Sequence, residues 1–139
     1  MSRDDNIATQ ERLGNAAVKG NLEEFDDIFA PDVVDHDPAP DQGPGPDGFK
    51  HFFSTLRTAF PDLNIEVEKL VADNDHVAIA YTVSGTHDGD FVGVAPTGKK
   101  VAARGMQIAR FEDGKIVERW GSSDELGILQ QLDASPAAA

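Results

Sequence analysis

The sequence has no cysteine, and this absence excludes disulfide bonds, a thiolate nucleophile and cysteine-ligated metal sites. It also has no apolar run near the roughly 20 residues that span a bilayer. The polar N-terminus, residues 1–5, lacks the apolar core of a signal peptide. We therefore expect a cytoplasmic protein with no membrane partner.

Basic residues are also scarce, because 12 Lys and Arg stand against 25 Asp and Glu and give a net charge of −13. A surface of this sign repels nucleic acid, so we expect no nucleic-acid partner. No phosphate-binding loop, dinucleotide fingerprint or nucleophilic serine motif occurs. The pairs His36-Asp37 and His87-Asp88 are not followed by a second ligand at metal-site spacing. We therefore expect no metal and no other cofactor.

At 139 residues, 40% of them hydrophobic, the chain is expected to form a single domain that buries about two-thirds of its unfolded surface. The patterned core covers about residues 7–133. Residues 134–139 are expected to be a frayed tail.

Helical patterns come first along the chain. They predict helices over residues 7–19 and 22–29, the second stopped by Pro31, and a third that begins at the N-cap Asp47 and ends before Pro61. The third helix has the clearest apolar stripe, at i, i+3, i+4, i+7 and i+11. Its members are Phe49, Phe52, Phe53, Leu56 and Phe60.

Strand patterns follow a short β-prone segment (33–38) and a proline-rich loop (39–46). They cover residues 65–72, 76–85, 99–111 and 115–121. A last short helix is expected from Ser122, which with Glu125 matches a capping box. Helices followed by antiparallel strands indicate an α+β fold. The curved sheet is expected to wrap around the third helix and to leave a cup for a ligand.

Several short motifs occur in an order typical of one family. They are Val34-Asp35-His36-Asp37-Pro38, Ala59-Phe60-Pro61-Asp62-Leu63, Gly85-Thr86-His87-Asp88-Gly89, Pro96-Thr97-Gly98-Lys99, Asp113-Gly114-Lys115-Ile116-Val117-Glu118-Arg119-Trp120, Asp124 and Leu129-Gln130-Gln131-Leu132. Together the motifs resemble those of the SnoaL-like polyketide cyclases and the related ester cyclase-like proteins, in the nuclear transport factor 2-like superfamily. The resemblance implies a cone-shaped α+β fold, a homodimer and cofactor-free ring closure by an aspartate acid/base.

Asp124 matches the position of the family's aspartate, which makes it the candidate acid/base. Trp120, Phe111 and Leu126 are expected to surround it with an apolar pocket, which would bring its pKa closer to neutrality. The alternative is that Asp124 only stabilises the start of the last helix. Asp124 lies in the first turn of the last helix, where the helix dipole alone favours an acid.

His36 is the second catalytic candidate, because it is expected at the rim of the cup, where it would hold a substrate oxygen. The alternative is a surface ion pair with Asp35 or Asp37. The family cyclases place a histidine on the strand before the Asp-Gly turn, and this sequence has none there.

Gln107 alternates with small residues and Phe111 and is expected to be the polar anchor inside the cup. Trp120, Phe111, Phe52 and His87 complete the expected substrate-binding set, although His87 is also explained as a turn residue.

The sequence therefore predicts a cyclase or isomerase that acts on a small apolar molecule bearing a ketone or an ester. The alternative is a binding module of the same fold without chemistry. The opposite face of the 99–111 strand carries Met106 and Ile108 and is expected to form a homodimer interface.

Overall fold

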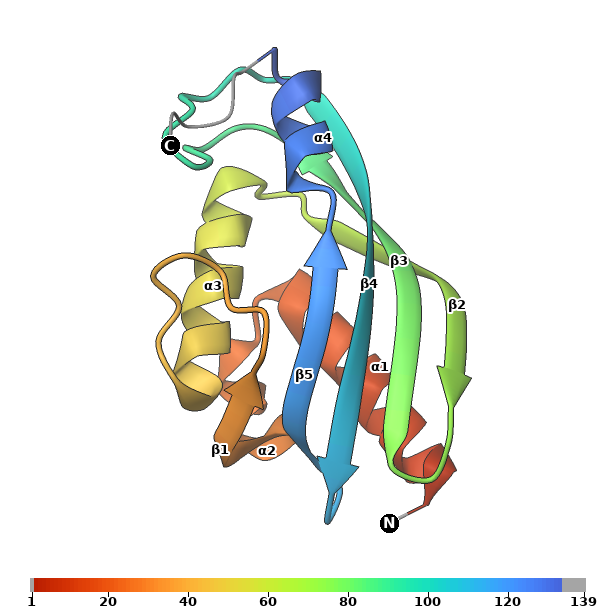
Figure 1. Ribbon diagram of the computed structural model, residues 1–139. Helices are drawn as coiled ribbons and strands as arrows, with labels where there is room; N and C mark the ends of the chain where they lie inside the picture. The colour runs from red at the N-terminus through yellow and green to blue at the C-terminus, as the bar shows by residue number, and fades with distance from the viewer. Residues whose placement is uncertain (1, 134–139) are drawn as a thin grey trace.

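Five strands form one curved sheet in the order β1–β5–β4–β3–β2, and helices lie against its concave side (Figure 1). The computed structural model describes residues 2–133, and the expected tail lies outside the described residues. The elements are α1 (Arg3–Lys19), η1 (Leu22–Glu24), α2 (Phe25–Ile28), β1 (Phe29–Asp35), α3 (Gly45–Ala59), β2 (Asn64–Ala72), β3 (His76–Thr86), β4 (Lys100–Glu112), β5 (Lys115–Ser123) and α4 (Glu125–Gln131). The predicted α+β fold is confirmed.

The first helix begins earlier than its apolar stripe suggests. Ser2 and Asp5 form a capping box, in which each side chain accepts the backbone N–H of the other at 3.1 Å. These bonds satisfy N–H groups that a helix start leaves unpaired, so α1 extends back to Arg3.

Pro31 does not stop a helix, as the sequence suggested, but lies within β1. A proline is tolerated there because β1 is an edge strand of the sheet. β1 pairs in parallel with β5, whereas the other three pairings are antiparallel, so the sheet is mixed rather than wholly antiparallel. Pro44 occupies the N-cap position of the third helix without a side-chain capping bond, and the predicted N-cap Asp47 lies inside the first turn.

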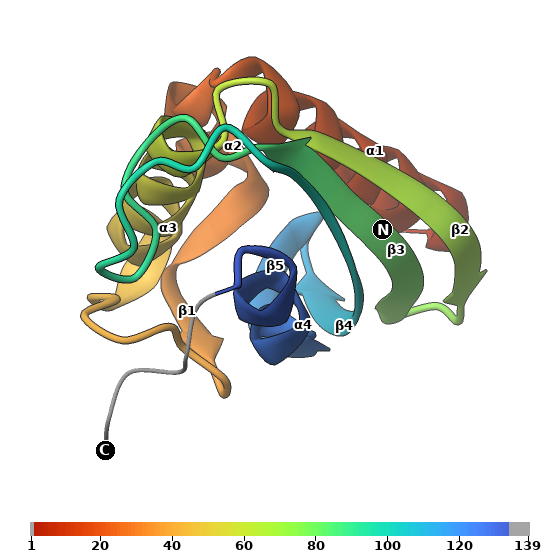
Figure 2. The same cartoon turned by 90° about the horizontal axis from the view of Figure 1, so that it is seen from above.

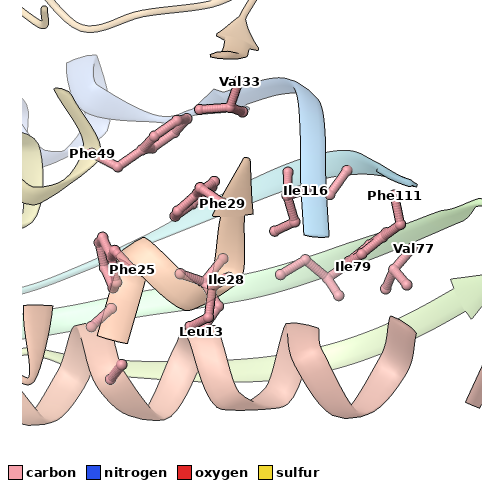
Figure 3. Packing of buried hydrophobic residues seen from close by; sticks show 13 residues of the cluster. Leu13, Phe25, Ile28, Phe29, Val33, Phe49, Val77, Ile79, Phe111 and Ile116 are labelled. Atoms are coloured by element: carbon pink, nitrogen blue, oxygen red, sulfur yellow. The ribbon is translucent and has the colours of Figure 1, made fainter. Parts of the chain in front are cut away.

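A first apolar cluster fills the space between the sheet and α1, α2 and the start of α3 (Figure 3). Phe29 stacks on Phe49, with ring centroids 4.2 Å apart, and Phe25 meets Phe29 edge to face at 5.5 Å. From the sheet, Ala109 and Phe111 of β4 join the cluster.

A second apolar cluster lies at the other end of the sheet and includes Ile128 and Leu132 with Ala103 of β4 and Phe60 after α3. Seen from above, α4 lies over the end of β5, beside β4 (Figure 2). The amide of Gln131 fixes this position, because it accepts the N–H of Ala102 at 2.9 Å and donates to its carbonyl at 2.8 Å.

The convex face of the sheet carries the exposed apolar side chains Val34, Val71, Met106 and Ile108. Ile108 pairs with Trp120 of β5 and with Ala78 of β3, so these apolar residues continue across neighbouring strands. None of the helices within residues 2–133 has the length and hydrophobicity needed to cross a bilayer.

Candidate active site

The concave row of β4 alternates strictly with the convex row. Val101, Ala103, Ala109 and Phe111 are buried, whereas Arg104, Met106 and Ile108 are exposed. Gln107 belongs to the concave row, as expected from the alternation. It lies with Gly105 between the second apolar cluster, to which Ala103 belongs, and the first, to which Ala109 belongs.

Arg119 of β5 connects Gln107 to a buried carboxylate. Its Nε donates to Gln107 Oε1 at 3.1 Å, and its Nη1 donates to both oxygens of Asp35 at 3.1 and 3.3 Å. The side chains of Arg119 and Asp35 are 19% and 6% exposed. Because Gln107 Oε1 is the acceptor in this contact, its amide nitrogen faces away from Arg119. None of the described residues accepts a hydrogen bond from that nitrogen.

Further bonds hold the carboxylate in place. Besides Arg119, Asp35 accepts hydrogen bonds from the side-chain amide of Gln42 at 3.0 Å and from the backbone N–H of Asp37 at 3.0 Å. The carboxylate of Asp37 in turn accepts the N–H of Gly121 at 2.9 Å. These contacts tie the loop after β1 to β5. With its oxygens occupied by these donors, Asp35 orients Arg119.

Tyr81 of β3 is the fourth member of this group, which we name the polar band: Asp35, Tyr81, Gln107 and Arg119. The Tyr81 residue is half-buried, and burial raises the pKa of its hydroxyl, while the charge of Arg119 opposes the shift. The hydroxyl therefore keeps its proton at neutral pH and acts as a hydrogen-bond donor.

Asp124 lies at the end of β5 and is the N-cap of α4. Its Oδ1 accepts the N–H of Gly127 at 2.9 Å, and its own backbone N–H donates to the backbone carbonyl oxygen of Arg104 at 3.0 Å. The carboxylate is exposed, as is Leu126, so the expected apolar pocket around Asp124 does not form. Gly121 pairs with Gln107, and Asp124 lies three residues beyond Gly121, just past the end of β5, which corresponds to about 10 Å of extended chain.

His36 and Trp120 do not lie in the cup as predicted; both are on the convex face. Their rings stack with centroids 4.8 Å apart, and His36 Nε2 donates to Glu118 at 2.7 Å. This bond, followed by that from Arg110, lowers the pKa of Glu118. Trp120 faces outward because β5 has a bulge at Val117. Phe111 pairs with Ile116 but Arg110 pairs with Glu118, so the side-chain alternation of β5 inverts at this point.

The other expected substrate-binding residues are dispersed. Phe111 is buried in the first apolar cluster, and Phe52 is half-buried on α3, where it meets Phe53 edge to face at 5.1 Å. His87 is 0% exposed, and its Nδ1 accepts the N–H of Thr97 at 3.2 Å, which leaves the ring proton on Nε2. No residue in the described part of the chain accepts that proton.

Two surface hollows, of about 350 and 380 Å³, lie away from the polar band. The first is lined by α1 and η1, and the second by residues around the start of α3. Among residues 2–133, no three His, Asp or Glu side chains are grouped as a metal site requires.

Sequence reasoning missed Asp35, Tyr81 and Arg119. Two signals pointed to them. Gly105 and Gly121 interrupt neighbouring strands, and a strand glycine often marks a place where a side chain approaches the backbone closely. Asp35 also shares its side of β1 with the buried Val33.

Known proteins resemble this chain along most of its length. Residues 7–132 match the family described as SnoaL-like polyketide cyclase. Aklanonic acid methyl ester cyclase DnrD of Streptomyces peucetius is 27% identical over 103 residues, which cover 73% of this chain and 69% of that protein.

Among solved structures, IdmH of Streptomyces antibioticus, a candidate polyketide cyclase, is 32% identical with a TM-score of 0.80, and the match covers 93% of this chain and 99% of IdmH. AclR of Streptomyces galilaeus, a candidate hydroxylase, is 31% identical with a TM-score of 0.84, and the match covers 97% of this chain and 100% of AclR. Proteins of one architecture thus carry names that imply different chemistries.

Proposed function

The chain belongs to the SnoaL-like polyketide cyclase family, and we propose that it is a cofactor-free cyclase or isomerase for a small apolar ketone or ester. The observation that carries the proposal is the polar band. An amide donor, Gln107, is held in place by Arg119 and lies between two apolar clusters of the concave face. A hydrogen-bond donor that a charged neighbour holds in place suits a carbonyl oxygen on which negative charge develops.

In the proposed reaction, the Asp124 carboxylate takes a proton from a carbon next to a carbonyl group. The electrons of the C–H bond pass to the carbonyl oxygen, which becomes an enolate oxygen and accepts a hydrogen bond from Gln107. The carbon then attacks a second carbonyl of the same molecule, and a C–C bond forms. The new alkoxide takes the proton back from Asp124, so the step needs no oxidant or reductant.

The family match and the open position of the carboxylate support this role for Asp124. One of its oxygens caps α4, and none of the described residues donates a hydrogen bond to the other. Asp124 lies just past the end of β5, about 10 Å of extended chain beyond the residue that pairs with Gln107, and this position suits a substrate that spans both.

The second candidate function is ligand binding without chemistry. Its support is that Asp124 is exposed and already serves α4 as an N-cap. In that case the polar band holds a ligand, and Asp124 only stabilises the helix end.

The substitution Asp124→Asn separates the two functions. Asparagine caps helices as well as aspartate does, so the variant should lose no more than the dipole interaction, about 0.3–1 kcal/mol. Turnover should fall about 10²–10⁴-fold if Asp124 transfers the proton. The substrate for the assay would come from metabolites that copurify with the protein and are identified by mass spectrometry.

Asp73→Asn is the matched control. Asp73 is also exposed, and it accepts the N–H groups of Asp75 and His76 at 2.9 and 2.7 Å in the turn between β2 and β3. That turn is at the opposite end of the sheet from α4 (Figure 1), so turnover should be unchanged. Full turnover in Asp124→Asn would end the acid/base role and leave ligand binding as the function.

A further inference from the structure

Two glycines on neighbouring strands let two long side chains lie flat on the concave face. Gly105 of β4 pairs with Tyr81 of β3, and Gly121 of β5 pairs with Gln107. A Cβ atom on Gly105 would lie 2.5 Å from the Tyr81 hydroxyl oxygen, and one on Gly121 would lie 2.7 Å from Cζ of Arg119. Only glycine therefore permits this arrangement at either position.

The glycines bring the ends of the two side chains near each other. Gly105 and Gly121 are diagonal neighbours across β4 and β5, a relation with a separation of roughly 7–8 Å. Because the Tyr81 hydroxyl lies over the first and the Arg119 guanidinium over the second, both groups face the same part of the concave surface.

Each side chain presents a donor without an acceptor. The Nε and Nη1 of Arg119 are used by Gln107 and Asp35, but Nη2 has no acceptor among residues 2–133, and neither has the Tyr81 hydroxyl. The buried polar atoms that lack a partner in this part of the chain are Asn6 Oδ1, Gln10 Oε1 and His87 Nε2. The two donors are not in that set, so solvent reaches both.

The Arg119 donor is also fixed before any ligand arrives. Asp35 and Gln107 hold the guanidinium on two of its edges, and Asp35 lies on the Nη1 side. The Nη2 edge is left over Gly121 on the concave face, where it presents positive charge. Fixed donors lose little freedom on binding, which is the property required for a site that stabilises negative charge on oxygen.

We propose that the Tyr81 hydroxyl and Arg119 Nη2, seated over Gly105 and Gly121, form a binding site for an anionic enolate or phenolate oxygen. The inference rests on the proposed function and adds two residues to it. When Asp124 removes the carbon proton, the electron pair reaches the carbonyl oxygen, and these donors bind that oxygen beside the Gln107 amide.

The test uses 4-nitrophenol, whose phenolate absorbs at longer wavelength than the neutral phenol, so its binding and ionisation are read without any turnover. The wild-type protein should bind the probe saturably and raise its ionised fraction. A hydrogen bond to a charged group is worth about 1.5–3 kcal/mol, so Tyr81→Phe and Arg119→Lys should each weaken phenolate binding about 10- to 100-fold.

Gly105→Ala is a third test variant. Its added methyl group displaces the Tyr81 hydroxyl without removing it, so phenolate affinity should fall as much as in Tyr81→Phe. Arg104→Lys is the control, since Arg104 is on the opposite face of β4 and pairs with Glu68 at 2.7 Å. It should bind the probe like the wild type. Circular dichroism would confirm that each variant is folded.

Absence of saturable binding, or equal affinity in the wild type, Tyr81→Phe and Arg119→Lys, would overturn the proposal. The Asp124→Asn variant keeps the two outcomes separate, because it should lose turnover and still bind the phenolate. If it keeps turnover while Tyr81→Phe loses the phenolate, the oxygen site stands and the acid/base role of Asp124 fails.

Discussion

Replacement of Arg119 by methionine should destabilise the fold, because it leaves the Asp35 carboxylate without its cation. Asp35 is 6% exposed, so water compensates little for the lost partner. Breaking a fully buried pair costs about 3–5 kcal/mol. Here Gln42 and the N–H of Asp37 still donate to the carboxylate, so we expect a loss of about 2–3 kcal/mol.

A loss of this size is easy to measure. At about 4 °C per kcal/mol for a chain of this length, the melting temperature of Arg119→Met should fall by about 8–12 °C. Urea unfolding should show the loss as a lower midpoint with an unchanged slope, since the substitution does not change the surface exposed on unfolding.

The double variant Asp35→Leu with Arg119→Met is the decisive comparison. It replaces both charges by apolar side chains, so the cost of an unpaired buried carboxylate disappears. Its loss of stability should be smaller than the sum of the two single losses by at least about 1 kcal/mol. Strictly additive losses would refute the reasoning, because they would show that the two side chains do not stabilise each other.

Two further predictions concern the convex face of the sheet and the carboxylate of Asp62. We propose that the apolar convex face forms a homodimer: sedimentation at micromolar concentration should show twice 14.9 kDa, and Ile108→Lys should shift the protein to monomer. A wild-type monomer would contradict this. Asp62 accepts the N–H and the hydroxyl of Thr86 at 2.6 and 2.7 Å, and the backbone bond is the larger cause of its lowered pKa. Because the folded pKa lies below the unfolded value of about 3.9, the contribution is present above about pH 4 and is lost as the pH falls further. Urea unfolding at stepped acidic pH should show a weaker acid dependence in Asp62→Asn, and an identical dependence would exclude this source.

Much of the sheet could be predicted because side chains alternate with a period of two. This period placed Gln107 on the concave row of β4 and Met106 on the convex row, and the structure agrees. The same period would not have placed Trp120 on β5, because the bulge at Val117 leaves no signature in composition. Trp120 has the same parity as the buried Ile116 and nevertheless lies outside.

The candidate site was harder to predict because it depends on contacts between strands far apart in sequence. Nothing local to Asp35 indicates Arg119 as its partner, since the parallel pairing of β1 with β5 brings them together. The cap of α4 was misplaced for a similar reason. Ser122 matches a capping box, but β5 continues through Ser123, and the cap falls on Asp124.

The Gln131 amide on α4 has a consequence for solubility. β4 begins before β5 has a residue to pair with it, since the last pair of that ladder is Gly105 with Ser123. The backbone near Ala102 would otherwise be a free strand edge, which is a template for pairing with another chain. Gln131 takes up both peptide groups of Ala102, as a neighbouring strand would. The last helix of the described chain therefore also protects the sheet against aggregation at this edge.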